Sequence, residues 1–68
     1  MLVNLKRCLD AKGISYRAYG AILGISEKSA WNKVNGKTDI TLPEAMTTKA
    51  ELFPEYDFDY LFASDRGA

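Results

Sequence analysis

Residues 24–37 have the sequence Gly-Ile-Ser-Glu-Lys-Ser-Ala-Trp-Asn-Lys-Val-Asn-Gly-Lys, in which Gly24-Ile25-Ser26 separates two short amphipathic segments. A turn of three or four residues that contains glycine is what a helix-turn-helix requires. Ser26 is a favoured N-cap, and Asn35-Gly36 tolerates the positive φ that follows a helix end. The stretch therefore predicts a helix over residues 27–35, preceded by a tight turn and another short helix.

The polar side of this helix is suited to hydrogen bonding with base edges. At about 100° per residue, Ala30, Trp31 and Val34 lie on one side, and polar residues lie roughly opposite. A helix in the DNA major groove needs donors and acceptors near its N-terminal half, such as lysine for guanine, asparagine for adenine and glutamate for a cytosine amino group. From periodicity alone, the alternative is an ordinary solvated face. The candidate base contacts are Glu27, Lys28, Ser29 and Asn32.

Residues on either side of that helix are suited to phosphate contacts. The preceding helix, predicted over residues 16–23 with Ser15 as its N-cap, presents N–H groups and hydroxyls at its start. Basic and amide side chains follow at the far end of the second helix, where they can hold a phosphate backbone. The candidate phosphate contacts are Ser15, Tyr16, Arg17, Ser26, Lys33, Asn35 and Lys37.

The first segment of the chain also has a helical pattern. Leu2, Leu5 and Leu9 recur at helical spacing, and Gly13 follows where a left-handed C-terminal cap belongs. This pattern predicts a helix over about residues 2–12.

Downstream, Thr41-Leu42-Pro43-Glu44 has the spacing of a capping box with proline in the first turn, which predicts a helix over about residues 42–53. Asp57 can cap a short turn that runs through Phe62. No segment has the pattern of a strand. The sequence therefore predicts an all-α, compact five-helix domain over residues 1–62 and a frayed tail over residues 63–68.

Composition excludes several functional classes. The chain has 68 residues, 47% of them hydrophobic, with no His and one Cys, so we expect one small folded core and no zinc site. Without a nucleophile–base pair or convergent carboxylates, we expect no enzyme, no metal and no cofactor, and Cys8 is expected to be a small buried hydrophobe. No apolar run approaches the ~18 residues that span a bilayer, so we expect a cytoplasmic protein without a membrane partner.

The formal net charge of zero is a cancellation between two halves. Residues 1–38 carry seven Lys and Arg against two Asp and Glu, which is a net charge of +5. Residues 39–68 carry two Lys and Arg against seven Asp and Glu, which is a net charge of −5. At physiological salt, screening over about 8 Å keeps the distant acids from cancelling the field of the basic half. The predicted helix-turn-helix lies in the half whose charge suits phosphates.

The ordered set Gly13-Ile14-Ser15, Gly20 and residues 24–37 resembles the helix-turn-helix of phage Cro and repressor proteins. Residues 41–44 and 52–56 resemble the tail of small Cro-like regulators of Gram-positive phages and prophages, and the resemblance spans about residues 2–62. It implies a lambda-repressor-like fold of five helices, with a helix-turn-helix formed by helices two and three. It also implies a Cro-like repressor that binds double-stranded operator DNA as a homodimer, with helix three in the major groove.

The resemblance implies roles for individual positions as well. Many relatives carry Gln or Lys where Glu27 stands, so an interhelical or local ion-pair role is the alternative for that residue. Ala30 is smaller than the Ile or Phe often found at its place, so we expect Trp31 in the core or at its edge, filling the volume. Gly20 indicates a close approach between the two helices. The family's base-reading places match Glu27, Lys28 and Asn32, and its phosphate contacts match Tyr16, Asn35 and Lys37.

The C-terminal part of the chain is unusually aromatic. Part of the run Tyr56, Phe58, Tyr60, Leu61 and Phe62 is expected to close the core. The remainder is a candidate dimer contact, for which we name Tyr56, Phe58 and Tyr60, because an exposed apolar patch on a short domain usually meets a partner. The competing interpretation of the whole chain is a protein-interaction modulator that binds a larger phage repressor protein through this acidic aromatic half.

Overall fold

The computed structural model describes residues 1–63, and within that range the chain is all-α, with five helices and no strand. The helices are α1 (Val3–Ala11), α2 (Tyr16–Leu23), α3 (Glu27–Val34), α4 (Leu42–Leu52) and α5 (Phe58–Leu61). The predicted fold class is confirmed, and the predicted helix ends differ from the observed ones by one residue or none. Of the tail predicted to fray, residues 64–68 lie outside the described residues.

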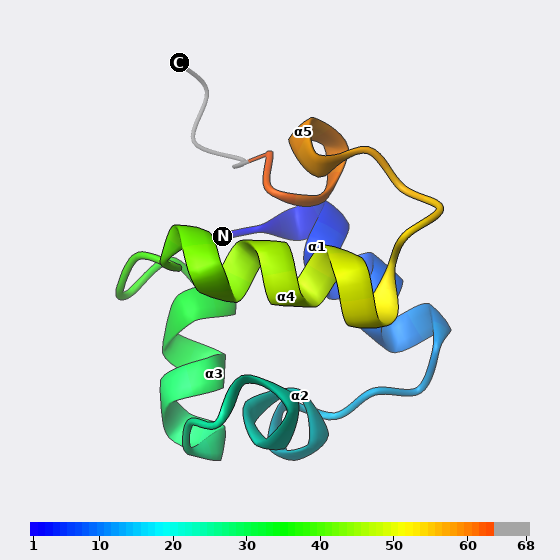
Figure 1. Cartoon of the computed structure of the whole chain (residues 1–68). Coiled ribbons are helices and arrows are strands. Elements are labelled where there is room, and N and C mark those ends of the chain that lie inside the picture. Colours follow the sequence, from blue (N-terminus) through cyan, green and yellow to red (C-terminus); the bar gives the residue numbers. More distant parts are fainter. Residues whose placement is uncertain (64–68) are drawn as a thin grey trace.

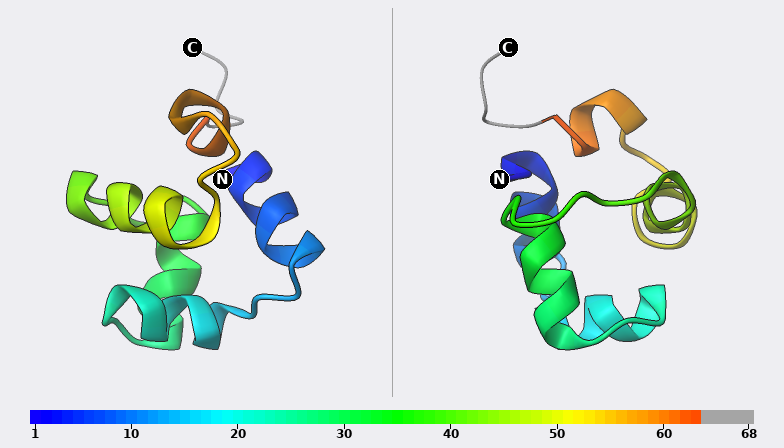
Figure 2. Two further views of the ribbon diagram at one scale, coloured as in Figure 1. Left: turned by 45° about the vertical axis from the view of Figure 1, so that its right-hand side comes forward. Right: turned by 90° about the vertical axis from the view of Figure 1, so that its left-hand side faces the viewer.

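The helices surround one core from four directions (Figure 1). Helices α1 and α3 lie on one side and α4 lies on the opposite side, as the turned views show (Figure 2). Helix α2 is at one end of the molecule and α5 is at the other. The helix-turn-helix formed by α2 and α3 is therefore remote from α5.

Local capping determines where three of the helices begin. The hydroxyl of Ser15 accepts a hydrogen bond from the Ala18 N–H, and that of Ser26 accepts one from the Ser29 N–H. At the start of α4, Thr41 and Glu44 form the reciprocal capping box that the sequence predicts. Asp57 occupies the N-cap position of α5, but its side chain makes no capping hydrogen bond.

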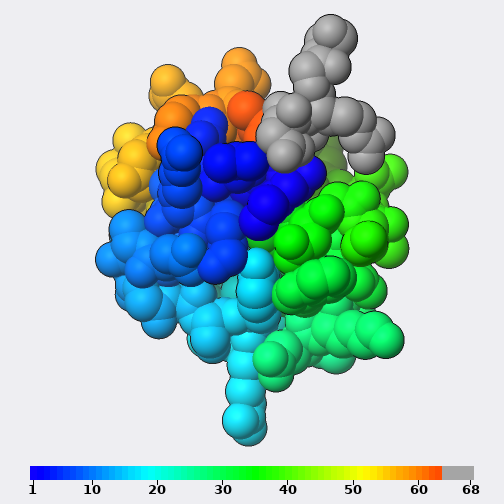
Figure 3. Space-filling view, turned by 180° about the vertical axis from the view of Figure 1, so that it is seen from behind, coloured from blue at the N-terminus to red at the C-terminus, as the bar shows by residue number. Residues whose placement is uncertain are grey.

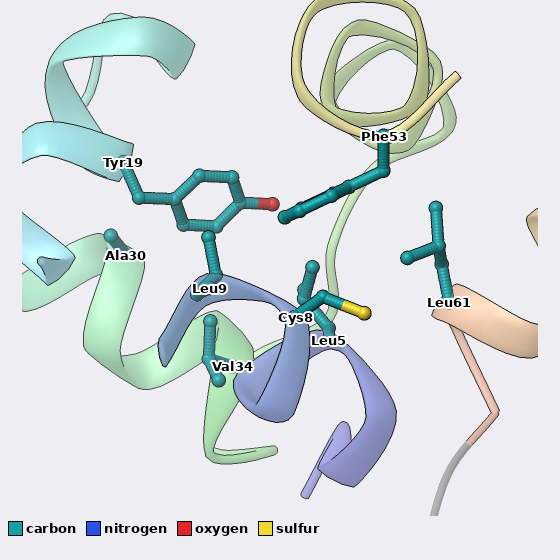
Figure 4. Packing of buried hydrophobic residues seen from close by; sticks show 8 residues of the cluster. All are labelled: Leu5, Cys8, Leu9, Tyr19, Ala30, Val34, Phe53 and Leu61. Atoms are coloured by element: carbon teal, nitrogen blue, oxygen red, sulfur yellow. The ribbon is translucent and has the colours of Figure 1, made fainter. Parts of the chain in front are cut away.

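The core is a single cluster to which every helix or its flank contributes (Figure 4). Inside it, Tyr19 Oη lies 2.6 Å from Thr48 Oγ1, and the Thr48 hydroxyl donates to the Glu44 carbonyl at 2.8 Å. Because a threonine hydroxyl has one proton, Tyr19 is the donor in the first bond. Burial raises the pKa of Tyr19. The buried cluster consists of Leu5, Cys8, Leu9, Tyr19, Ala30, Val34, Phe53 and Leu61, so the expected burial of Cys8 is confirmed.

The α2–α3 turn packs directly on Gly20. A Cβ atom at that position would lie 2.8 Å from the Ile25 carbonyl oxygen and 2.9 Å from that of Ser26. Gly24 ends α2 in the left-handed conformation with φ of 75°, which suits glycine because it has no Cβ. The close approach predicted at Gly20 is therefore present, and its partner is the backbone of the turn.

Trp31 differs from the expectation that it fills the core or its edge. Its side chain is 41% exposed, whereas Ala30 is fully buried. A small side chain at Ala30 allows α3 to pack closely on its neighbours, and this leaves no internal volume for an indole. The prediction for Trp31 was wrong because helical periodicity does not specify the distance between packed helices.

The C-terminal aromatic run divides as expected between core and surface. Leu61 is fully buried, and Phe58 and Phe62 are half-buried with ring centroids 4.9 Å apart. Tyr56 and Tyr60 are exposed, and their rings stack with centroids 5.6 Å apart. The interaction of Tyr56 with the Cys8 thiol is the main cause that raises the pKa of Tyr56, followed by burial.

Candidate nucleic-acid interface

Helix α3 presents a continuous polar stripe on the side away from its buried residues Ala30 and Val34. Lys28 and Asn32, one helical turn apart, lie at the middle of this stripe. Within residues 1–63, no hydrogen bond or ion pair engages either side chain. Lys28 is exposed and Asn32 is half-buried, so both side chains have surface that an external ligand can contact.

The other two candidate base contacts are placed differently. Glu27 is exposed at the first position of α3, and its carboxylate makes no ion pair within the described residues, so the local ion-pair alternative is absent here. Ser29 is half-buried, and its hydroxyl oxygen accepts a hydrogen bond from Ser26 Oγ at 3.0 Å. The hydroxyls of Ser26 and Ser29 thus serve first to shape the start of the helix.

A side-chain hydrogen bond joins the end of α3 to the start of α2. Asn35 Nδ2 donates to the Trp31 carbonyl at 2.9 Å and to Tyr16 Oη at 3.4 Å. The Lys6 ammonium lies 5.3 Å from the centroid of the Tyr16 ring. These contacts place four of the predicted phosphate contacts, Ser15, Tyr16, Arg17 and Asn35, in one region, because Ser15 and Arg17 adjoin Tyr16 and both are exposed.

The loop after α3 is fixed by its backbone. The Lys37 N–H donates to the Asn32 carbonyl at 2.8 Å, and the Leu2 N–H donates to the Val34 carbonyl at the same distance. The Lys37 side chain is exposed and has no ion-pair partner among the described residues. Seen from behind, α1, the start of α2 and the end of α3 with this loop form one face (Figure 3).

Lys33 does not join the exposed polar stripe. Its ammonium lies 3.0 Å from Glu44 Oε1 and donates to the Asp39 carbonyl at 3.1 Å, and only 14% of its side chain is exposed. Glu44 is the same residue that closes the capping box of α4. Lys33 therefore links α3 to α4, so we leave it out of the proposed interface.

The Glu44 carboxylate is held in its charged form. Burial would raise the pKa of Glu44, but hydrogen bonds from the Thr41 backbone N–H and the Lys33 ammonium outweigh this effect and lower it below its ordinary value. Because the pKa of Glu44 is lower in the folded protein than in the unfolded chain, its charge stabilises the fold at pH values above the unfolded-state pKa. That contribution is lost as the pH falls through the folded-state pKa.

Glu44→Gln is expected to weaken the acid dependence of stability. At neutral pH we expect the variant to be about 1 kcal/mol less stable, because the Lys33 ammonium loses a charged partner. Below about pH 4.5, the ordinary pKa of a glutamate, the difference from the parent protein should shrink. Thermal unfolding followed by circular dichroism from pH 3 to pH 7 measures this. Glu51→Gln, on the same helix but without an ion pair in residues 1–63, is the control, and an equal response in both variants would contradict the role of Glu44.

Ion pairs neutralise part of the positive charge in the first half of the chain. Lys6 pairs with Asp10 at 2.6 Å, and Lys12 pairs with Glu55 at 3.1 Å, in addition to the pair of Lys33 with Glu44. Hydrogen bonding to Asp10 raises the pKa of Lys6, and hydrogen bonds from its own backbone N–H and from Lys12 lower that of Glu55. The Lys and Arg side chains of residues 1–63 that lack an ion pair or hydrogen bond are Arg7, Arg17, Lys28 and Lys37.

On the opposite side of the core, α4 exposes an apolar stripe. Leu42 is 65% exposed and Met46 is 58% exposed, one helical turn apart. A groove of about 380 Å³ continues from Met46 past Ala50 and Pro54 to Phe58. In the sequence, the spacing of Leu42, Met46 and Ala50 by four residues is the signal that indicates this stripe.

Comparison of the chain with protein-family models, curated proteins and solved structures yields no match. Among the helices of residues 1–63, none has the length and apolar character needed to cross a bilayer. The same residues contain no group of three or more His, Cys, Asp or Glu side chains that could hold a metal ion.

Proposed function

We propose that this protein is a sequence-specific DNA-binding regulator of transcription, with α3 as the helix that enters the major groove. The observation that carries the proposal is the stripe of exposed Lys28 and half-buried Asn32, whose side chains have no partners in residues 1–63. The turn before α3 packs closely on Gly20 and so positions the helix that carries this stripe. Side chains of these types at the exposed face of a second helix suit guanine and adenine edges.

Phosphate contacts would set the register of the helix on the duplex. Arg17 at the start of α2 and Lys37 after α3 flank the stripe, and neither has an ion pair among the described residues. The ammonium and guanidinium groups can neutralise phosphates on either side of the groove, while Tyr16 and Asn35 hold the two helix ends together. Glu27 remains a candidate base contact, because a carboxylate can accept from a cytosine amino group.

The proposed mechanism is occupancy by a homodimer. Two copies of α3 would enter successive major grooves of one operator, and the bound protein would exclude polymerase or a competing regulator. Of the candidate dimer contacts Tyr56, Phe58 and Tyr60, we propose the exposed pair Tyr56 and Tyr60, since two stacked aromatic rings provide a self-complementary apolar surface, whereas Phe58 is half-buried. This function requires no metal and no cofactor, and it places the protein in the bacterial cytosol.

Selection from a random duplex library tests the proposal directly. The purified protein should enrich a short sequence, and a labelled duplex with two copies of it, about one helical turn apart, should bind more tightly than random DNA. Electrophoretic mobility shift at fixed salt measures both affinities. Failure to enrich any sequence, with equal affinity for all duplexes, would contradict sequence-specific binding.

Lys37→Ala is expected to weaken binding to every duplex by a similar factor. Loss of one phosphate contact should reduce the slope of log K against log salt by about 0.9. Fluorescence anisotropy of a labelled duplex between about 50 and 200 mM KCl measures the change in slope. Lys49→Ala is the matched control, because the Lys49 ammonium donates to the carbonyls of Pro54 and Tyr56 on another part of the surface. An unchanged slope in Lys37→Ala would remove this residue from the phosphate contacts.

A second candidate function is favoured by the apolar stripe of α4. Leu42 and Met46 are exposed in the C-terminal half of the chain, residues 39–68, whose net charge is −5. An apolar groove in the acidic half of the chain fits a basic partner, such as a larger regulator protein. Mobility shift of the DNA next to its own gene separates the two functions. A shift with the purified protein alone supports the first, and a shift only in the presence of a neighbouring regulator supports the second.

A further inference from the structure

Trp31 is the single tryptophan of the chain, and 41% of its surface is exposed on α3. Within residues 1–63, no hydrogen bond engages its indole N–H. A tryptophan combines a large apolar ring with one hydrogen-bond donor, and it usually satisfies both where it is buried or bound. In the free protein the indole N–H has no partner within residues 1–63, and the ring is only partly covered.

The place of Trp31 around α3 distinguishes it from the proposed base contacts. At about 100° per residue, Lys28 and Asn32 lie about 40° apart in the middle of the outward stripe, and Trp31 lies about 60° beyond Lys28. The middle of a helix in the major groove faces base edges, and its flanks face the sugar–phosphate walls. Trp31 is therefore directed at a wall of the groove.

A contact with the start of α2 identifies which wall this is. Trp31 is about 40° from Asn35 around the helix, and Asn35 Nδ2 donates both to the Trp31 carbonyl and to Tyr16 Oη. Tyr16 begins α2, where Arg17 is exposed and unpaired among the described residues. The flank that carries Trp31 is thus the flank on the side of the proposed phosphate contacts.

We propose that Trp31 is a contact to the sugar–phosphate backbone of DNA, with its indole N–H donating to a phosphate oxygen and its ring packing on the adjacent deoxyribose. The inference rests on the proposed function, and it adds a neutral residue to the charged phosphate contacts. Because an indole carries no charge, its contact releases no counterion. It also carries no base preference, because a phosphate contact positions the protein without reading the sequence.

These properties give Trp31 a signature that differs from those of its neighbours. We expect Trp31→Phe, which retains an aromatic ring and removes the donor, to bind about 5- to 20-fold more weakly to the selected duplex and to random duplexes alike. The slope of log K against log salt should be unchanged. Trp31→Ala should bind more weakly still. Thermal unfolding of Trp31→Phe should match that of the parent protein, since the ring is outside the core.

Two measurements on the intact chain test the proposal. Anisotropy of a labelled duplex at several KCl concentrations gives the affinity and the salt slope, and the emission of Trp31, the single tryptophan, reports whether its surroundings change when DNA binds. Ile22→Ala, which trims a 38% exposed apolar side chain from α2, is the control and should bind as the parent does.

Each contrary result identifies what has failed. If the parent protein binds the duplex while Trp31→Phe binds within about twofold of it and Trp31 emission is unchanged, the backbone contact is wrong and the proposed function stands. If Trp31→Phe loses affinity for the selected duplex only, Trp31 is a base contact and the backbone assignment is overturned. If the parent protein binds no duplex, the proposed function and this inference are both overturned.

Discussion

Asn32→Ala is expected to lower the discrimination between the selected duplex and a duplex altered at one or two base pairs by about 1–3 kcal/mol. An asparagine amide can donate to and accept from one adenine, and alanine offers neither group. Asn32 is one turn from Lys28 at the middle of the outward stripe, and its side chain makes no hydrogen bond in residues 1–63. Its removal should therefore change binding while the fold keeps its stability.

The measurement compares affinities for a matched pair of duplexes, with random DNA as the reference. Binding of Asn32→Ala to random DNA should stay within about twofold of the parent, because the phosphate contacts that dominate non-specific binding remain. Lys37→Ala is the contrasting control, since it should lower both affinities together. An equal loss by Asn32→Ala on selected and random DNA would contradict its assignment as a base contact.

The parts of the fold that the sequence predicted are those held by short-range contacts. Ser15 and Ser26 each cap a helix through an N–H three residues later, and the Thr41–Glu44 box spans the same distance. Such bonds depend on residue type and local spacing alone. For this reason the starts of α2, α3 and α4 coincide with their predicted positions.

The parts that the sequence could not predict depend on how the helices are arranged. Lys33 looks like a free basic residue on a wheel of α3, but the start of α4 brings Glu44 to within 3.0 Å of its ammonium. Lys12 is likewise paired with Glu55, far along the chain. The count of +5 in the first half of the chain describes the sequence correctly, but it overstates the charge that is available to a ligand.

Trp31 and Leu42 show the same limit for apolar residues. Periodicity placed Trp31 on the apolar side of α3, yet close packing at Ala30 leaves its ring exposed. Leu42 follows a strong capping signal, which indicates where a helix begins but not which residues of its first turn are buried. A pattern of apolar residues therefore predicts a helix more reliably than it predicts which of those residues become the surface for a partner.

Gly20→Ala is expected to destabilise the protein, although alanine is the better helix former. In an unhindered helix the exchange would stabilise the fold by about 1 kcal/mol. Here the added Cβ would lie 2.8 Å from the Ile25 carbonyl oxygen and 2.9 Å from that of Ser26, both of which are backbone atoms. The balance of the two effects depends on whether this backbone can move.

Two hydrogen bonds oppose that movement. The Ile25 N–H donates to the Gly20 carbonyl at 2.8 Å, and the Ser26 carbonyl accepts from the Ala30 N–H at 3.0 Å as the first bond of α3. Displacing the turn would strain both bonds and would shift α3 against its buried face at Ala30. Overpacking of this kind costs about 1–3 kcal/mol, so the clash should exceed the gain in helix propensity.

We therefore expect a net loss of up to about 2 kcal/mol for Gly20→Ala, and each kcal/mol lowers the Tm of a domain of this size by about 4–8 °C. Thermal unfolding measures the change, and Ala21→Ser, at the exposed neighbouring position, should shift the Tm by much less. DNA affinity should fall together with stability, because the start of α3, with Lys28 on it, is positioned by the same turn. A Tm above that of the parent would show that the turn yields to the methyl group, and the close packing at Gly20 would then not be what holds α3 in place.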